Sequence, residues 1–225
     1  MDYGFILGQL AKGLEVTFEL TLLGFLGGFA LGFLLAIART YGGGIARALA
    51  VAYIELIRGT PMLLQLYIIG FGLPLLIRQY LPNFVMNPTI AALLGIMLNS
   101  AAYQAEYMRG AFNSIESGQI EAALSLGMTR WQIIRHVVFP QAFRIMLPSW
   151  TNEMVYLLKY SSLAMLLAVP ELMYMASVTA SETFLYAQIY LIVAGIYLVF
   201  ATLIIQLMRI VELKIHIPGV TTIKR

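Results

Sequence analysis

The stretch SGQIEAALSLGMTRWQIIRHVVFP, residues 117–140, is the segment around which the chain is organised. It is polar enough to lie in water, whereas long apolar segments flank it on both sides. Ser117 is expected to cap a first short helix, and Gly127 to end that helix in the left-handed conformation. Thr129 is expected to cap a second short helix, which Pro140 would limit. The pattern predicts two short helices joined by a tight glycine turn outside the lipid.

The composition is that of a membrane protein. Of 225 residues, 60% are hydrophobic and 11% are charged, whereas soluble domains carry about 25% charged residues. The net charge of +3 is too small to indicate nucleic-acid binding. The sequence contains no Cys and no GxxxxGK[ST] motif, so we expect no thiolate metal site, no redox chemistry and no ATP held by that route. The start of the chain, Met1-Asp2-Tyr3-Gly4, lacks the basic residues of a cleavable signal peptide, and none is expected.

Apolar segments predict an all-α integral membrane protein with five transmembrane helices in a single domain, residues 1–225. A short helix lying at the interface is expected first, over residues 3–14. The spans are expected at about 15–38, 48–77, 88–113, 141–169 and 185–208, with a loop over 78–87, a polar turn over 170–184 and a basic tail over 210–225. The second segment would be about 45 Å long as a helix, against a hydrocarbon core of ~30 Å. We therefore expect it to break or kink at Gly59-Thr60-Pro61.

The Lys and Arg residues predict the orientation of the chain. With residues 117–140 assigned to one side, and Arg58 and Lys159 left out because they fall within spans, the other side holds two basic residues, Lys12 and Arg78. The side of residues 117–140 holds ten: Arg39, Arg47, Arg109, Arg130, Arg135, Arg144, Arg209, Lys214, Lys224 and Arg225. Because cytoplasmic loops are enriched in positive charge, we expect the polar loop and the C-terminus in the cytoplasm and the N-terminus outside.

Glu121-Ala122-Ala123, Gly127 six residues after Glu121, and Pro140 thirteen residues after Gly127 resemble the "EAA" loop of ATP-binding-cassette importer permeases. The words ELIRGTP (55–61), SAAY (100–103), EYMRG (106–110), FPQA (139–142) and KYSSL (159–163) are similar to the polar amino acid subgroup of that family. The resemblance covers about residues 14–213. Two departures are visible: Val137-Val138-Phe139-Pro140 stands where the family often has Ile-x-Leu-Pro, and Ser161 stands where it often has Thr.

The resemblance implies a type I importer permease-like fold and a permease subunit of an ATP-driven amino acid importer in a prokaryotic inner membrane, working by alternating access. The implied partners are a dimer of cytoplasmic ATPases that binds ATP and Mg²⁺, a second permease subunit of the same or another sequence, an external substrate-binding protein, and lipid. This chain is expected to hold no cofactor and to catalyse no reaction itself. The coupling loop is expected over about residues 114–140, with the ATPase-coupling residues Glu121, Ala122, Ala123 and Gly127.

A substrate site is expected near the bilayer midplane. Asn99 lies about eleven residues into the third span and Glu153 about twelve into the fourth, which places both near mid-depth. An acid at that depth is costly and marks a functional site by default. The predicted substrate-binding residues are Asn99, Ser100, Tyr103, Asn152 and Glu153. Since a carboxylate favours a cation in a low-dielectric cavity, the expected substrates are arginine, lysine or histidine.

Other charges in the spans leave alternatives open. Glu55 and Arg58 are three residues apart and are expected to pair on one helix face, either as a structural neutral pair or as a gate. Lys159 is six residues from Glu153, which is off its face, and Arg58 is a possible partner of Glu153 across helices. His136 and His216 stand apart in the sequence, so no metal site is expected.

Two alternative functions also stay open at this point. A permease of the same class for glutamine, glutamate or another polar amino acid is one. A secondary transporter or channel is the other, against which stand the five spans and the lack of a visible inverted repeat.

Overall fold

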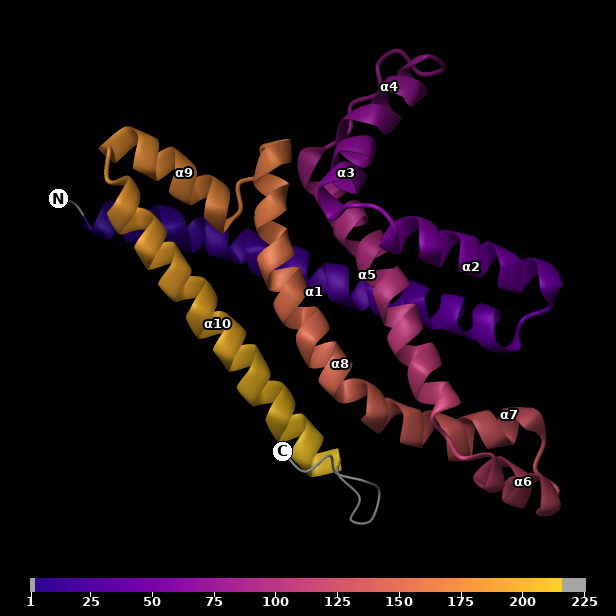
Figure 1. Ribbon diagram of the computed structural model, residues 1–225. Helices are drawn as coiled ribbons and strands as arrows, with labels where there is room; N and C mark the ends of the chain where they lie inside the picture. The colour runs from indigo at the N-terminus through magenta and orange to yellow at the C-terminus, as the bar shows by residue number, and fades with distance from the viewer. Residues whose placement is uncertain (1–2, 216–225) are drawn as a thin grey trace.

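The computed structural model describes residues 3–215, which form a helical protein without strands in that range (Figure 1). The α-helices are α1 (Tyr3–Tyr41), α2 (Gly44–Arg58), α3 (Met62–Tyr67), α4 (Leu73–Arg78), α5 (Pro88–Asn113), α6 (Ser117–Ser125), α7 (Arg130–Ile133), α8 (Phe139–Tyr160), α9 (Leu172–Thr183) and α10 (Tyr186–Ile215). Two π-helical turns, η1 (Ile68–Gly72) and η2 (Ile134–Val138), and the 3₁₀ segment η3 (Ser161–Leu167) join some of them. The all-α prediction is confirmed for these residues. His216, Lys224 and Arg225 lie outside them, as do Met1 and Asp2.

The first helix differs from the prediction. The separate interfacial helix over residues 3–14 is wrong, because α1 is one continuous helix of 39 residues. Buried residues continue at helical spacing through the expected boundary, from Leu10 through Gly13 to Thr17. A Cβ at Gly13 would lie 2.8 Å from the Glu171 carbonyl oxygen, so α1 packs directly against the start of α9 there.

Helices α1 and α5 pack closely because glycines line α1 on one side. Gly24, Gly28 and Gly32 are buried at a spacing of four residues. A Cβ at Gly28 would lie 2.7 Å from the Ser100 side chain, and one at Gly32 would lie 2.8 Å from the Ala101 carbonyl oxygen. Small residues at this spacing let two helix backbones approach one another within a membrane.

The predicted break in the second apolar segment is confirmed. The helix axis turns by 105° between α2 and the α3–α4 segment, at Gly59-Thr60-Pro61. The loop predicted over residues 78–87 is also confirmed, and Asn87 caps α5 through its side-chain oxygen, which accepts from the backbone N–H groups of Thr89 and Ile90. Pro88 follows at the first helical position, where its missing N–H costs nothing.

The polar turn predicted over residues 170–184 is wrong, because most of it forms α9. Its axis is bent by 54° from the preceding segment that ends with η3. Two residues in the left-handed conformation bound it, Ala168 with φ 59° before it and Phe184 with φ 58° after it. Glu171 starts the helix by accepting hydrogen bonds from two backbone N–H groups, which is how an Asp or Glu side chain stabilises a helix start.

The structure identifies fewer candidate membrane spans than the five predicted. In residues 3–215, two helices are long and apolar enough to cross a membrane, α1 and α10. Counting each strongly bent helix pair as one span brings the number to four. Helix α5 has 26 residues but does not meet the same criterion of length and apolarity, because polar and charged side chains interrupt it. The span predicted over residues 88–113, and with it the total of five, therefore remains a prediction.

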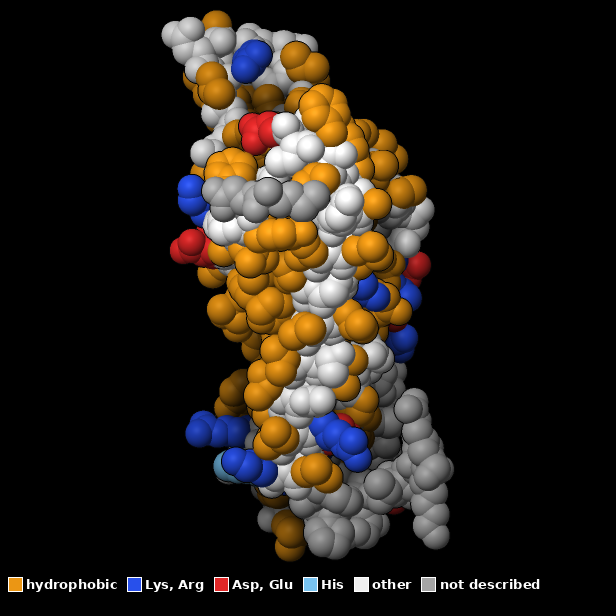
Figure 2. Space-filling model, turned by 90° about the vertical axis from the view of Figure 1, so that its left-hand side faces the viewer, with side chains coloured by type: hydrophobic (Ala, Val, Ile, Leu, Met, Phe, Trp, Pro, Cys, Tyr) orange, Lys and Arg blue, Asp and Glu red, His pale blue; other side chains and the backbone are white. Residues whose placement is uncertain are grey.

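The elements that carry the polar loop lie at one end of the molecule. Figure 1 shows α6 and α7 at the lower end together with the end of α10, and α4 and α9 towards the opposite end. Ile215 of α10 packs against the same core as Ala123 and Ile133 of the loop. Hydrophobic side chains cover most of the middle of the face in Figure 2. This distribution suits a chain whose midsection lies in lipid.

Candidate functional site

The loop over α6 and α7 is built by two well-defined helix ends. Gly127 has φ +76°, as predicted. Its N–H donates to the Leu124 carbonyl oxygen at 2.9 Å, and the Met128 N–H donates to the Ala123 carbonyl oxygen at 3.2 Å. These are the two bonds of a Schellman motif, which satisfies the last carbonyls of α6 and needs a residue that tolerates positive φ. A glycine at this position therefore fixes the angle between α6 and the chain that follows.

The second cap of the loop is also confirmed. The Thr129 side chain accepts from the Gln132 N–H, and the Gln132 side chain accepts from the Thr129 N–H at 2.8 Å, which is a capping box. Two other predictions for the loop are wrong. The residue preceding α6 is Glu116, whose backbone is extended, and Ser117 is the first helical residue without a capping role. Pro140 does not stop the helix, because η2 leads directly into α8 and the proline falls in its first turn, where no N–H is needed.

The predicted coupling residues lie on the surface of the loop, with one exception. Glu121, Ala122 and Gly127 are exposed, whereas Ala123 is buried in the core beneath α6. The exposed surface of the loop also carries large apolar side chains: Leu124 is 53% exposed, Leu126 83% and Trp131 65%. Apolar side chains projecting from a polar loop are typical of a surface that binds another protein.

Gln141 connects the loop to helix α8, which leads away from it. The Gln141 Nε2 of α8 donates to the Gln119 side chain of α6 and to the Val137 carbonyl oxygen at 2.9 Å. Helix α8 continues from this point to Glu153, with Pro148 inside it. The loop and Glu153 are therefore connected by a single helix.

Glu153 is buried and is bound by hydroxyl groups. Its residue exposure is 4%. The Ser100 Oγ donates to Glu153 Oε1 at 2.7 Å, and the Tyr107 hydroxyl donates to Oε2 at 3.4 Å. Gln104 supports this arrangement, because its Nε2 donates to Ser100 Oγ and to the Phe25 carbonyl oxygen of α1, each at 3.0 Å. Ser100, Gln104 and Tyr107 have the spacing i, i+4, i+7, so they form one polar stripe on α5 that faces α8 and α1.

Asn99 and Tyr103 belong to a second stripe on α5, which faces the corner between α2 and α3. The Asn99 Nδ2 donates to Gln65 Oε1 of α3 at 2.9 Å. The guanidinium carbon of Arg58 lies 5.5 Å from the centre of the Tyr103 ring, within the distance of a cation–π contact. The structure thus places Ser100 in contact with Glu153. Asn99 and Tyr103 instead contact Gln65 and Arg58 at the corner between α2 and α3.

The remaining predicted residues do not join Glu153. Asn152 is exposed on α8. Lys159 is also exposed, and its Nζ lies 4.8 Å from the centre of the Tyr156 ring one turn earlier on the same helix. Adjacent residues on a helix point about 100° apart, so Asn152 lies on a different side from Glu153.

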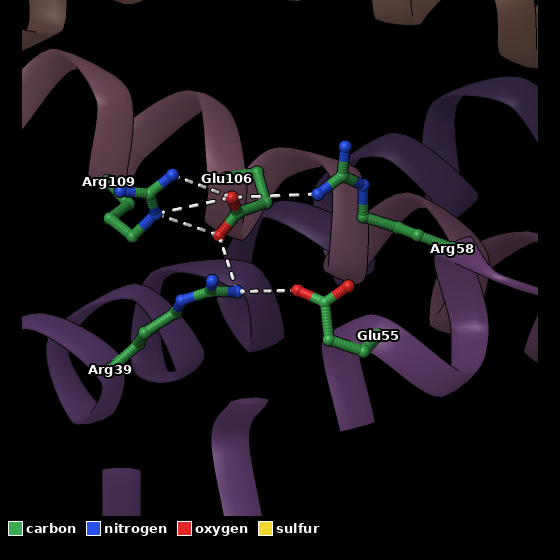
Figure 3. A network of polar contacts seen from close by, with 5 residues as sticks. All are labelled: Arg39, Glu55, Arg58, Glu106 and Arg109. Atoms are coloured by element: carbon green, nitrogen blue, oxygen red, sulfur yellow. Dashed lines mark hydrogen bonds and ion pairs between the residues drawn. The ribbon is translucent and has the colours of Figure 1, made fainter. Parts of the chain in front are cut away.

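The predicted pair of Glu55 and Arg58 is wrong, because each has a different partner in a network of five charged residues (Figure 3). Glu106 of α5 lies at its centre, with Arg39 Nη1 of α1 at 2.8 Å, Arg109 Nη2 at 2.9 Å and Arg58 Nη1 at 3.5 Å. Glu55 lies 3.5 Å from Arg39 and its side chain is 61% exposed. Because Arg58 is bound to Glu106, its predicted alternative pairing with Glu153 is not observed.

Comparison with known proteins identifies the family to which this chain belongs. Residues 28–217 match the family described as the binding-protein-dependent transport system inner membrane component. The chain belongs to this family of importer permeases. It is 38% identical over 208 residues to the glutamine transport system permease protein of Escherichia coli strain K12, covering 92% of this chain and 93% of that protein. It is 36% identical over 203 residues to a probable amino-acid ABC transporter permease of Bacillus subtilis strain 168, covering 90% and 87%.

Solved structures support the same assignment. An amino acid ABC transporter crystallised with histidines matches with a TM-score of 0.85 and 32% identity, covering 95% of this chain and 99% of that chain. A methionine ABC transporter in an inward-facing conformation matches with a TM-score of 0.77 at 20% identity, which shows the shared fold. The permease is thus a multi-pass membrane subunit of an amino acid ABC importer, a class that works with a separate ATPase and a substrate-binding partner.

Sequence reasoning missed several polar residues of the permease. Gln104 and Tyr107 could have been found, because they follow Ser100 at helical spacing on the same face. Gln65 is a polar residue four positions after Pro61 in an otherwise apolar run. Glu171 was overlooked because it lay in the supposed turn.

Glu171 is a second buried acid, and its bonds explain its burial. Its side chain accepts from the N–H groups of Met173 and Tyr174 at 2.8 Å each, and the hydroxyls of Thr17 and Tyr197 lie 3.5 Å from Oε2. These contacts join α9 to α1 and α10. Within the described residues these bonds satisfy the carboxylate without a ligand.

Proposed function

We propose that the permease imports basic amino acids, with Glu153 as the group that binds the positive charge of the substrate. The observation that carries the proposal is the environment of Glu153. All four ion pairs among residues 3–215 involve Glu55 or Glu106, and Glu153 has hydroxyl partners only. A buried carboxylate without a cation is costly, and a cationic ligand would supply what the chain itself does not.

Ligand binding at Glu153 requires the helices to move. At 4% exposure the carboxylate is closed off from solvent in this structure. Alternating access supplies the movement: the site opens to the outside to accept the amino acid and to the inside to release it. Since α8 leads from the coupling loop directly to Glu153, displacement of the loop by the ATPase moves the site without a long relay.

The coupling loop is the proposed contact with the ATPase. Glu121 and Ala122 on α6, together with Leu124 and Trp131, offer one carboxylate and an apolar surface to a groove on that partner. The Gly127 turn sets the direction in which α6 projects. We propose five spans, with the loop and the C-terminus in the cytoplasm and the N-terminus outside, and a second permease subunit completing the pathway.

The names of two relatives mention different amino acids. One similar permease is named for glutamine and a similar structure was solved with histidines. Every amino acid carries an α-ammonium group, so Glu153 is also compatible with glutamine as an alternative substrate. The side chain of arginine or lysine adds a second cation, as does that of histidine when its imidazole is protonated, which makes Glu153 more favourable for these substrates.

Uptake by proteoliposomes distinguishes the two substrates. The permease is reconstituted with its ATPase and binding protein, and the native chain is compared with Glu153→Gln for arginine and glutamine. A hydrogen bond to a charged group contributes about 1.5–3 kcal/mol, so arginine transport should weaken roughly ten- to a hundredfold in kcat/KM. Glu212→Gln, an exposed position on α10, is the matched control. Equal losses for arginine and glutamine would show that Glu153 does not select basic substrates.

A further inference from the structure

The network around Glu106 contains more positive than negative charge, because it joins three arginines to two glutamates. Arg39 and Arg109 approach Glu106 closely, at 2.8 and 2.9 Å. Arg58 has one carboxylate contact among residues 3–215, to Glu106 at 3.5 Å, and its side chain is the most exposed of the three arginines at 38%. Figure 3 shows one terminal nitrogen of Arg58 directed at Glu106 and the other directed away from it. Arg58 is therefore the arginine that the network neutralises least.

Arg58 also contacts Tyr103, a residue next to those that bind Glu153. The guanidinium carbon lies 5.5 Å from the centre of the Tyr103 ring. Ser100 and Tyr107, whose hydroxyls donate to Glu153, lie three residues before and four residues after Tyr103 on α5. At about 100° per residue, the direction of Tyr103 differs by about 60° from that of Ser100 and by about 40° from that of Tyr107. Tyr103 thus lies at the border between the two polar stripes of α5, with Glu153 bound on one side of it and Arg58 on the other.

The two opposite charges match the two charged groups of an amino acid. The proposed function assigns the positive charge of the substrate to Glu153 and leaves the α-carboxylate without a partner. A carboxylate removed from water is costly unless it is paired and hydrogen-bonded. A guanidinium suits this task, since it can donate two parallel hydrogen bonds to one carboxylate. Lys159 is six positions from Glu153 on the same helix and off its face, so it is worse placed than Arg58 to act together with Glu153.

We propose that Arg58 binds the α-carboxylate of the substrate while Glu153 binds the positive charge, and that the Tyr103 ring positions the guanidinium. This inference rests on the proposed function and deepens it. The substrate then lies across Tyr103, with its carboxylate towards α2 and its cationic group towards α8. The site accepts amino acids with a free carboxylate and rejects the corresponding amides and amines.

Binding of arginine and argininamide to the purified permease–ATPase complex tests the role of Arg58. In argininamide an uncharged amide replaces the α-carboxylate and the guanidinium is kept. The binding protein is left out, because its own selectivity would mask that of the permease. Arg58→Gln should weaken arginine binding roughly ten- to a hundredfold, the range for a hydrogen bond to a charged group. Argininamide binding should change less than about threefold.

Arg109→Gln is the matched control, because it removes another arginine from the same network. It should leave the ratio of the two affinities unchanged. Equal losses for arginine and argininamide in Arg58→Gln would mean that Arg58 only stabilises the network, and would overturn the proposal.

A pair of substitutions at Tyr103 keeps every charge in place, so it remains measurable if Arg58→Gln does not assemble. Tyr103→Leu removes the ring and should reduce the preference for arginine over argininamide about two- to fivefold, the range for an exposed cation–π contact. Tyr103→Phe keeps the ring and should retain the native preference. A native preference in Tyr103→Leu would contradict the positioning of Arg58 by the ring.

The same two ligands separate this inference from the proposed function. Glu153→Gln should weaken arginine and argininamide alike, because both keep the guanidinium. If Glu153→Gln weakens neither ligand, the proposed function fails. If Glu153→Gln weakens both ligands as expected and Arg58→Gln also weakens them equally, the role of Arg58 fails and the proposed function stands.

Discussion

Replacing Gly127 by valine should uncouple the permease from its ATPase without preventing membrane insertion. Gly127 has φ +76°, and nothing lies within 4 Å of a Cβ built there. A clash is therefore not the cause of the expected effect; the backbone conformation is. A residue with a Cβ costs about 1–2 kcal/mol in the left-handed region, and valine, being β-branched, is among the least tolerant. That energy lowers the population of the correctly shaped turn by a factor of about 5–30.

The chain offers a matched control for this substitution. Gly43 also has open space around its Cβ position, but its φ of −66° and ψ of 172° are extended values that valine adopts readily. Gly43→Val should therefore leave transport unchanged. Gly127→Asn should lie between Gly127→Val and the native chain, because asparagine tolerates positive φ better than other residues do.

The assay measures two quantities on the permease reconstituted with its ATPase and binding protein. Substrate-stimulated ATP hydrolysis and amino acid uptake should fall together in Gly127→Val, while the amount of permease in the membrane stays normal. Coupled transport in Gly127→Val equal to that of Gly43→Val would refute the assignment of residues 117–140 as the coupling loop.

Three other predictions follow from the charges, the packing and the topology. Glu106→Gln removes the partner of three arginines and should lower the free energy of unfolding by about 1.5–3 kcal/mol, whereas Glu55→Gln should lower it by at most about 1 kcal/mol. Thermal unfolding in detergent compares the two variants, and equal shifts in unfolding temperature would contradict the central place of Glu106. Gly28→Val should reduce the yield of folded permease more than Gly28→Ala, since the α1–α5 contact leaves little space, and wild-type yield for both would disprove that close packing. An impermeant thiol reagent should label Asp2→Cys in intact cells but not Gln119→Cys until the membrane is opened, and the reverse pattern would overturn the orientation.

Features set by local chemistry could be predicted from the sequence. The left-handed Gly127, the Thr129 cap, the break at Pro61 and the start of α5 after residue 87 each depend on one or two neighbouring residues, so their signals survive in the printed sequence. Ser117 failed as a cap because α6 begins one residue earlier than expected: Glu116 is the extended residue before the helix, and Ser117 is already helical. The continuous α1 and the helix α9 were missed because contacts with distant elements, at Gly13 and Glu171, stabilise them.

The candidate site was predicted only in part, because some of its contacts depend on how distant helices pack. The mid-membrane depth of Glu153 stays a prediction. Helix spacing alone gives the face that Ser100 shares with Gln104 and Tyr107, but of these three only Ser100 was predicted for the site. Which of Asn99 and Ser100 meets Glu153 depends on how α5 rotates between α1, α3 and α8, and that rotation is fixed by glycines on α1 and by Gln65. Glu55 and Arg58 were expected to pair because they are neighbours on one helix. Arg39 and Glu106 offered each a better-placed partner from another helix.

Equilibrium binding of arginine to the purified permease–ATPase complex, without the binding protein, tests the central claim most directly. The native complex should bind arginine, lysine and histidine should displace it more effectively than glutamine, and Glu153→Gln should weaken binding roughly ten- to a hundredfold. Glu212→Gln should bind arginine as the native chain does. An arginine affinity that is the same in Glu153→Gln and the native permease would contradict the account that Glu153 receives the positive charge of the substrate.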